Sequence, residues 1–106
     1  MKRLALAALL SASLVAFAQD AEFSIAIKDH KFSPDRIEVP AGKKVKLVVE
    51  NQDATPEEFE SHSMKVEKVI PGKSKATIFI GPLKAGEYKF VGEFNEKTAK
   101  GVIVAK

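Results

Sequence analysis

The chain is built from short segments in which every second residue is apolar. Six segments show this alternation, at Phe23, Ile25 and Ile27; at Ile37 and Val39; at Val45, Leu47 and Val49; at Ala76, Ile78 and Ile80; at Tyr88 and Phe90; and at Val102 and Val104. A period of two places alternate side chains on opposite faces of a β-strand. Turns rich in Gly and Pro separate the segments at fairly even spacing, which is typical of a β-sandwich or a small barrel. The pattern therefore predicts an all-β fold.

One stretch does not follow a single phase. Phe59 occupies an odd position, whereas Met64 and Val66 occupy even ones. One regular strand cannot bury all three, because its side chains alternate between faces. We therefore expect a bulge or a loop near residues 61–63, and bulges often lie beside functional sites. A short helical turn is expected at residues 55–58, because Thr caps helices and Pro suits the first helical position.

The first 18 residues have the pattern of a signal peptide. A cationic start, Met1 to Arg3, precedes an apolar run over residues 4–17, and Ala16-Phe17-Ala18 has the small-x-small form of a cleavage site. The run is shorter than the roughly 20 residues that span a bilayer. We predict cleavage before Gln19 and a single periplasmic domain over residues 19–106 that is not an integral membrane protein. An N-terminal membrane anchor is the alternative.

Charge and composition exclude several classes of function. The full chain has 17 basic and 14 acidic residues, and 15 and 14 remain without Lys2 and Arg3. So small an excess gives no reason to expect nucleic-acid binding. The chain contains no Cys, so no disulfide can form. No phosphate-binding loop or nucleophile elbow is recognisable, so catalysis by this chain alone is not predicted. Assistance to Fe(II) oxidation within a complex stays open.

Three motifs carry a resemblance to a known family. They are Phe32-x-Pro34-x-x-Ile37-x-Val39-x-x-Gly42, the strand Val45 to Asn51, and Gly86-x-Tyr88-x-Phe90 followed by Gly101 to Val104. With these motifs residues 19–106 resemble a cupredoxin-like domain. The resemblance implies a Greek-key β-sandwich of about seven strands. It also places a first His ligand soon after the strand that ends at Asn51, and Cys and His ligands in the last loop.

The last loop departs from that family pattern. Gly92 stands about where the thiolate would be, and Asn95 about where the second His would be. A blue-copper centre takes two His, one Cys thiolate and a weak axial Met. Because the chain has no Cys, a blue-copper centre and electron transfer by it are excluded. Asn is also a poor ligand for a transition metal.

A narrower resemblance concerns three shorter stretches. Thr55-Pro-Glu-Glu-Phe-Glu-Ser61, Glu67-Lys-Val69 and Gly92-Glu-Phe94 are similar to the small periplasmic cupredoxin-like proteins encoded beside bacterial iron permeases of the oxidase-dependent type. This resemblance implies an accessory protein of iron uptake that binds copper or iron. It implies an iron permease or a periplasmic iron-binding protein as the partner.

The candidate metal ligands lie in two stretches that this fold brings to one end. We predict a non-blue site formed by Glu58, Glu60, His62 and Glu93, with Met64 as an optional soft ligand. Gathered carboxylates raise one another's pKa unless a cation compensates their charge. Carboxylates favour hard ions, and an imidazole adds Cu(II), Zn(II) and iron.

Each candidate also has an ordinary interpretation. On this interpretation the first two, Glu57 and Glu58, are solvated residues of a turn. Glu60 and His62 would then be surface residues, and Met64 would belong to the core. If these interpretations hold, the alternative function is a metal-free β-sandwich that docks its Glu-rich end onto a membrane or periplasmic partner.

Overall fold

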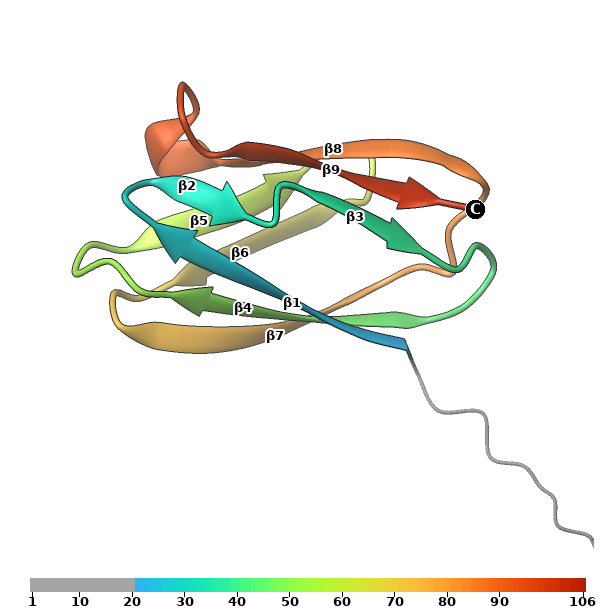
Figure 1. The fold of residues 1–106 in the computed structure, drawn as a ribbon, viewed down its shortest axis with the longest axis horizontal. Coiled ribbons are helices and arrows are strands. Elements are labelled where there is room, and N and C mark those ends of the chain that lie inside the picture. The colour runs from blue at the N-terminus through green and yellow to red at the C-terminus, as the bar shows by residue number, and fades with distance from the viewer. Residues whose placement is uncertain (1–20) are drawn as a thin grey trace, which may run out of the picture.

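The computed structural model describes residues 21–106, which form two β-sheets packed face to face (Figure 1). The predicted signal peptide, residues 1–18, lies outside the described residues. The strands are β1 (Ala21–Lys28), β2 (Lys31–Ser33), β3 (Arg36–Val39), β4 (Val45–Asn51), β5 (Glu57–Ser61), β6 (Val66–Ile70), β7 (Ser74–Ile80), β8 (Gly86–Gly92) and β9 (Lys100–Ala105). A 3-10 turn, η2 (Glu93–Asn95), follows β8. No helix within residues 21–106 is long and apolar enough to cross a membrane.

The two sheets have the orders β2-β1-β4-β7 and β3-β9-β8-β5-β6. Two of the pairings, β1 with β4 and β3 with β9, are parallel, and the others are antiparallel. The predicted all-β sandwich is confirmed. The structure has nine strands rather than about seven, because β2 is a separate strand of three residues and residues 57–70 form two strands.

An aromatic cluster lies at the centre of the core between the sheets. The ring of Phe90 stacks on Phe59 with centroids 4.8 Å apart, and Phe32 meets Phe90 edge-on at 4.9 Å. All three side chains are at most 5% exposed. Such aromatic pairs add to the stabilisation that burial of their apolar area provides.

The last strand buries the opposite phase from the one that the sequence pattern indicated. Ile103 and Ala105 are buried, whereas Val102 and Val104 are only partly buried. The run of four apolar residues permits both phases. The register decides between them, because Ile103 lies beside both Ile37 of β3 and Tyr88 of β8.

The expected helical turn at residues 55–58 is wrong, because Glu57 and Glu58 begin strand β5. That strand is paired on both sides, with β6 and with β8, and these ladders satisfy its backbone. The expected change of phase after Phe59 is confirmed as a loop, the hairpin between β5 and β6. Within this hairpin the Ser61 hydroxyl accepts from the Met64 amide at 3.2 Å, and it also donates to the Lys89 carbonyl of β8 at 2.7 Å.

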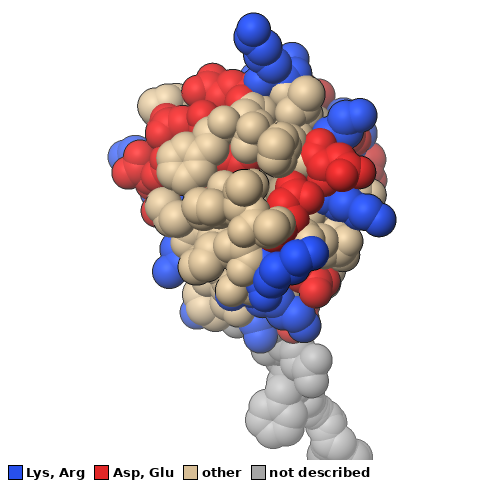
Figure 2. Space-filling view, turned by 90° about the vertical axis from the view of Figure 1, so that its left-hand side faces the viewer, with Lys and Arg blue, Asp and Glu red and all other residues tan. Residues whose placement is uncertain are grey.

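One end of the sandwich gathers the start of β5, the end of β8 and η2, on the left of Figure 1. The side-chain amide of Asn51, which is fully buried, secures the loop at this end. It donates to the carbonyls of Thr55 at 2.8 Å and Ile70 at 3.1 Å. Figure 2 shows an uncharged area in the middle of this end, with both acidic and basic side chains around it.

We expect Phe90→Ala to lower the free energy of unfolding by about 3–5 kcal/mol, because it removes a ring from the centre of the core. The matched control is Phe79→Ala on β7, whose ring is 53% exposed beneath the Lys44 ammonium at 4.7 Å. That control should cost less than about 1 kcal/mol. Urea denaturation measures both, and equal losses would contradict the assigned core.

Candidate metal centre

Strand β5 directs consecutive glutamates to opposite faces of its sheet. Glu57 and Phe59 point into the core and are 2% and 0% exposed. Glu58 and Glu60 therefore point to the outer face, because side chains alternate along a strand. Glu60 lies opposite Glu67 of β6 in the antiparallel register, so Glu67 shares that face.

Three carboxylates meet on this outer face, from three different elements. One oxygen from each of Glu58 (β5), Glu67 (β6) and Glu93 (η2) lies within 4.8 Å of the other two. We call these three residues the carboxylate cluster. Glu67 was missing from the predicted ligand set. Its signal is the hairpin register, which pairs it with Glu60 and can be read only once the turn at residues 62–65 is known.

Two carboxyl groups on this face, those of Glu58 and Glu60, form hydrogen bonds with Glu93. A hydrogen bond from the Glu58 carboxyl group to Glu93, followed by burial and the negative charges of Glu93, Glu67 and Glu60, raises the pKa of Glu58 to about 7. A hydrogen bond to Glu93 likewise raises the pKa of Glu60. As the acceptor of these hydrogen bonds, first from Glu58 and then from Glu60, Glu93 has a lowered pKa. Glu93 is therefore the acceptor in these hydrogen bonds, and Glu58 and Glu60 are the groups that hold the shared protons.

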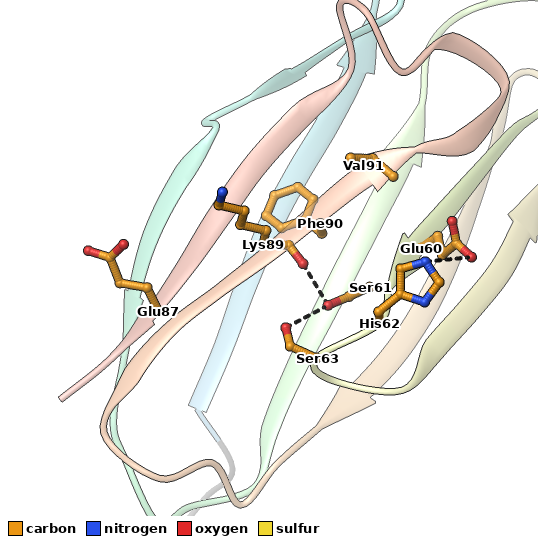
Figure 3. A pocket seen from close by; sticks show the side chains of 8 residues that line it. All are labelled: Glu60, Ser61, His62, Ser63, Glu87, Lys89, Phe90 and Val91. Carbon is orange, nitrogen blue, oxygen red and sulfur yellow. Dashed lines mark hydrogen bonds and ion pairs between the residues drawn. The ribbon is translucent and has the colours of Figure 1, made fainter.

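The two predicted ligands from the β5–β6 hairpin, His62 and Met64, differ in burial. His62 stands at the edge, with its Nε2 atom 3.8 Å from Glu60 Oε2 and its side chain 94% exposed (Figure 3). Met64 is partly buried and packs against the hydrophobic core. The structure thus brings together Glu58, Glu60, His62 and Glu93 but places Met64 on the core side. Metal ligation by these residues stays a prediction.

The interpretation of Glu57 and Glu58 as solvated residues of a turn is wrong, because they are 2% and 9% exposed, and only Glu57 points into the core. Its Oε1 atom accepts hydrogen bonds from the backbone amides of Glu58 and Phe94, both at 2.9 Å. Its Oε2 atom accepts from the side-chain amide of Asn95 at 2.7 Å. The available signal was its phase, since Glu57 alternates in step with Phe59 and Ser61.

Comparison with known proteins places the chain among copper-protein folds. A family model described as a cupredoxin-like domain matches residues 3–105. A relative in Rickettsia prowazekii (strain Madrid E), "Uncharacterized protein RP394", is 45% identical over 83 residues. Those residues are 78% of this chain, and the match spans 66% of the relative's length.

Solved copper proteins share the architecture at low sequence identity. Auracyanin A, a blue copper protein of Chloroflexus aurantiacus, has a TM-score of 0.68 and 14% identity over 83% of this chain and all of its own. The metal-binding domain of the Cu(I)-exporting ATPase CopA of Streptococcus pneumoniae D39, solved with Cu(I), has a TM-score of 0.69 and 15% identity over 80% of this chain and 84% of its own. At this identity the likeness establishes the fold alone.

The blue-copper group that this fold often carries does not fit the residues present. A β-carbon added to Gly92 would lie 2.6 Å from Cδ of Glu57 and 2.7 Å from Cβ of Ala99. The space in which a thiolate would project is therefore filled by the Glu57 carboxylate. Asn95, in the place of the second His, is hydrogen-bonded to the same carboxylate.

The raised pKa of Glu58 predicts a loss of stability as the pH rises. An unfolded glutamate titrates near 4.5, so between pH 4.5 and about 7 the folded chain holds the proton more tightly. The stabilisation from this proton is complete below pH 4.5 and is lost as the pH rises through 7. Glu93, with its lowered pKa, changes the free energy of unfolding only below pH 4.5. We therefore expect the free energy of unfolding to fall from pH 5 to pH 8 more steeply in the wild type than in Glu58→Gln.

Urea denaturation at four pH values across this range measures the difference. The matched control is Glu50→Gln, which removes an exposed carboxylate from β4 in the other sheet. Its profile should run parallel to that of the wild type. Parallel profiles for Glu58→Gln and the wild type would refute the proton shared with Glu93.

Proposed function

Since this chain belongs to the cupredoxin-like domain family, we propose that it binds a metal cation at the carboxylate cluster on the outer face of its five-stranded sheet. The observation that carries the proposal is the convergence of oxygens from Glu58, Glu67 and Glu93 within 4.8 Å. Like charges at this separation repel one another unless protons or a cation lie between them. A cation would replace the proton that Glu58 shares with Glu93.

The ligands present suit a non-blue copper or iron site rather than a blue-copper centre. Three carboxylates make a hard, oxygen-rich site, which suits Mg(II), Ca(II) and Mn(II), and Fe(III) as a hard cation fits the same ligands. His62, through its contact with Glu60, stands where an imidazole could join the site and favour Cu(II). The copper-protein relatives support copper as a candidate, and the resemblance to proteins of iron uptake supports iron.

The biological role that we propose is that of a periplasmic accessory protein of iron uptake. The support is the sequence similarity over Thr55–Ser61, Glu67–Val69 and Gly92–Phe94, and these three stretches supply every carboxylate of the cluster. Glu67 and Glu93 are exposed, so a cation held there would be accessible to a partner. An iron permease or a periplasmic iron-binding protein is the partner proposed, and the chain would deliver iron or support Fe(II) oxidation within their complex.

Calorimetric titration with Mn(II), Fe(II) under anaerobic conditions, Cu(II) and Zn(II) tests metal binding directly. We expect a dissociation constant well below millimolar for at least one ion. Glu58→Gln, Glu67→Gln and Glu93→Gln should each weaken that binding by about tenfold or more, since ligand charge sets the affinity of oxygen sites. Glu50→Gln is the control that should leave it unchanged. Millimolar or weaker binding of every ion would refute the proposal.

Affinity should also depend on pH. A cation competes with the proton held by Glu58, whose pKa is about 7. Below pH 7 the dissociation constant should therefore increase by up to about tenfold per pH unit, and above pH 8 it should level off. Titrations at pH 5.5, 6.5, 7.5 and 8.5 measure this dependence. An affinity that does not vary over that range would show that no proton is displaced.

An interaction module that needs no metal is the second candidate, because two large apolar side chains flank the cluster. Val69, opposite Glu58, is 49% exposed, and Phe94, next to Glu93, is 52% exposed. An apolar centre with a polar rim is the usual composition of a protein–protein interface. Retention of the purified permease by the immobilised chain, compared with and without EDTA, separates the two functions. Retention that survives EDTA and is lost in Val69→Ser favours docking.

A further inference from the structure

The buried Glu57 carboxylate lies on the inner side of the same sheet whose outer face carries the cluster. It belongs to β5, one residue before Glu58, and it is 2% exposed. A charged group so deeply buried is costly unless it is hydrogen-bonded. All three of its hydrogen bonds come from residues that either belong to the cluster or lie within two residues of it in sequence: Glu58, Phe94 and Asn95.

The Glu57 side chain accepts a backbone hydrogen bond just beyond the point where the pairing of β5 with β8 ends. The register of these two strands runs through the pairs Glu60–Val91 and Phe59–Gly92. Beyond Gly92 the chain leaves the strand and enters η2, so Glu93 and Phe94 lie past the end of the ladder. There the carboxylate of Glu57 accepts the amide of Phe94 in place of a backbone carbonyl.

A single atom therefore joins the backbones of the two segments that carry the cluster. Oε1 of Glu57 accepts the amide of Glu58 and the amide of Phe94, each at 2.9 Å. The first amide belongs to one cluster residue, and the second follows Glu93 directly. The other oxygen is held by Asn95, and the packing of Gly92 and Ala99 leaves the carboxylate little freedom to move.

We propose that Glu57 is the positioning residue of the carboxylate cluster, setting the separation of Glu58 and Glu93 from the inner side of the sheet. This inference rests on the proposed function where it concerns metal affinity, and on hydrogen-bond geometry alone where it concerns the placement of η2. The space beside Gly92 and Asn95, where copper ligands would lie in a blue-copper protein, is occupied in this chain by the Glu57 carboxylate, which supports the site on the outer surface. Residues that hold and orient metal ligands commonly affect affinity by 10–100-fold.

Four variants separate positioning from general stability. Glu57→Ala removes the acceptor and should release η2. Glu57→Gln keeps a carbonyl oxygen toward the two amides, and Asn95 can turn its own amide to accept from the new donor, so it should preserve the site. Asn95→Asp places a second carboxylate against Glu57 and should disrupt the site. Combining Glu57→Gln with Asn95→Asp restores a donor between the two oxygens and should rescue it.

Two readouts apply to every variant. The first is the hydrogen-exchange rate of the Phe94 amide in the metal-free protein, relative to the amide of Val49 in β4. The second is the affinity for Mn(II) and Cu(II). In Glu57→Ala and Asn95→Asp the Phe94 amide should exchange at least about tenfold faster relative to Val49, and the affinity should fall by about 10–100-fold. Glu57→Gln and the double variant should stay within about threefold of the wild type on both readouts.

The control for stability is Ile25→Val, which weakens the core in β1 of the other sheet, where Ile25 is 1% exposed. It should leave the relative exchange rate and the affinity unchanged. If the wild type binds none of the four ions titrated above, the proposed function fails, yet the exchange rates still test the placement of η2. Unchanged exchange and affinity in Glu57→Ala would overturn the inference, as would a double variant no better than Asn95→Asp.

Discussion

The hydrogen bonding of one buried carboxylate connects the segments at the end of the sandwich where β5 begins and β8 ends. An ion such as Glu57 is expensive to remove from water, and its three donors offset that cost. The requirement extends to the neighbours. Position 92 must lack a β-carbon, Asn95 must present an amide, and the chain after β8 must turn so that the Phe94 amide faces inward. The 3-10 turn η2 is therefore inseparable from the burial of Glu57.

The alternation of β5 turns this internal constraint into an external one. Because Glu57 must point inward, Glu58 and Glu60 must point outward, and β6 adds Glu67 opposite Glu60. The turn η2 then brings Glu93 over the same face. The fold, rather than any attraction for one another, holds these carboxylates together, and the hydrogen bonds of Glu58 and Glu60 to Glu93 reduce their repulsion. This is the electrostatic condition that a cation would relieve.

The sequence predicted the class of fold, but several details depended on register. Period-two alternation sufficed for the sandwich, and the stretches around Glu58 and Glu93 were correctly expected to meet. Glu67 was not foreseen, because cross-strand neighbours follow from the turn and not from spacing along the chain. The phase of β9 was read wrongly, since an uninterrupted run of apolar residues is compatible with either face until β3 and β8 select Ile103.

The absence of Cys is better understood as one part of a rearrangement than as a single lost ligand. Restoring a thiol at position 92 would drive its β-carbon into the Glu57 carboxylate, so the interior is closed to a soft-ligand centre by packing as well as by composition. What remains is an oxygen-rich group on an open face. A blue-copper centre needs a thiolate ligand, whereas gathered carboxylates suit a hard cation. The geometry therefore supports the proposed cation site on the outer face and leaves no place for a blue-copper centre in the interior.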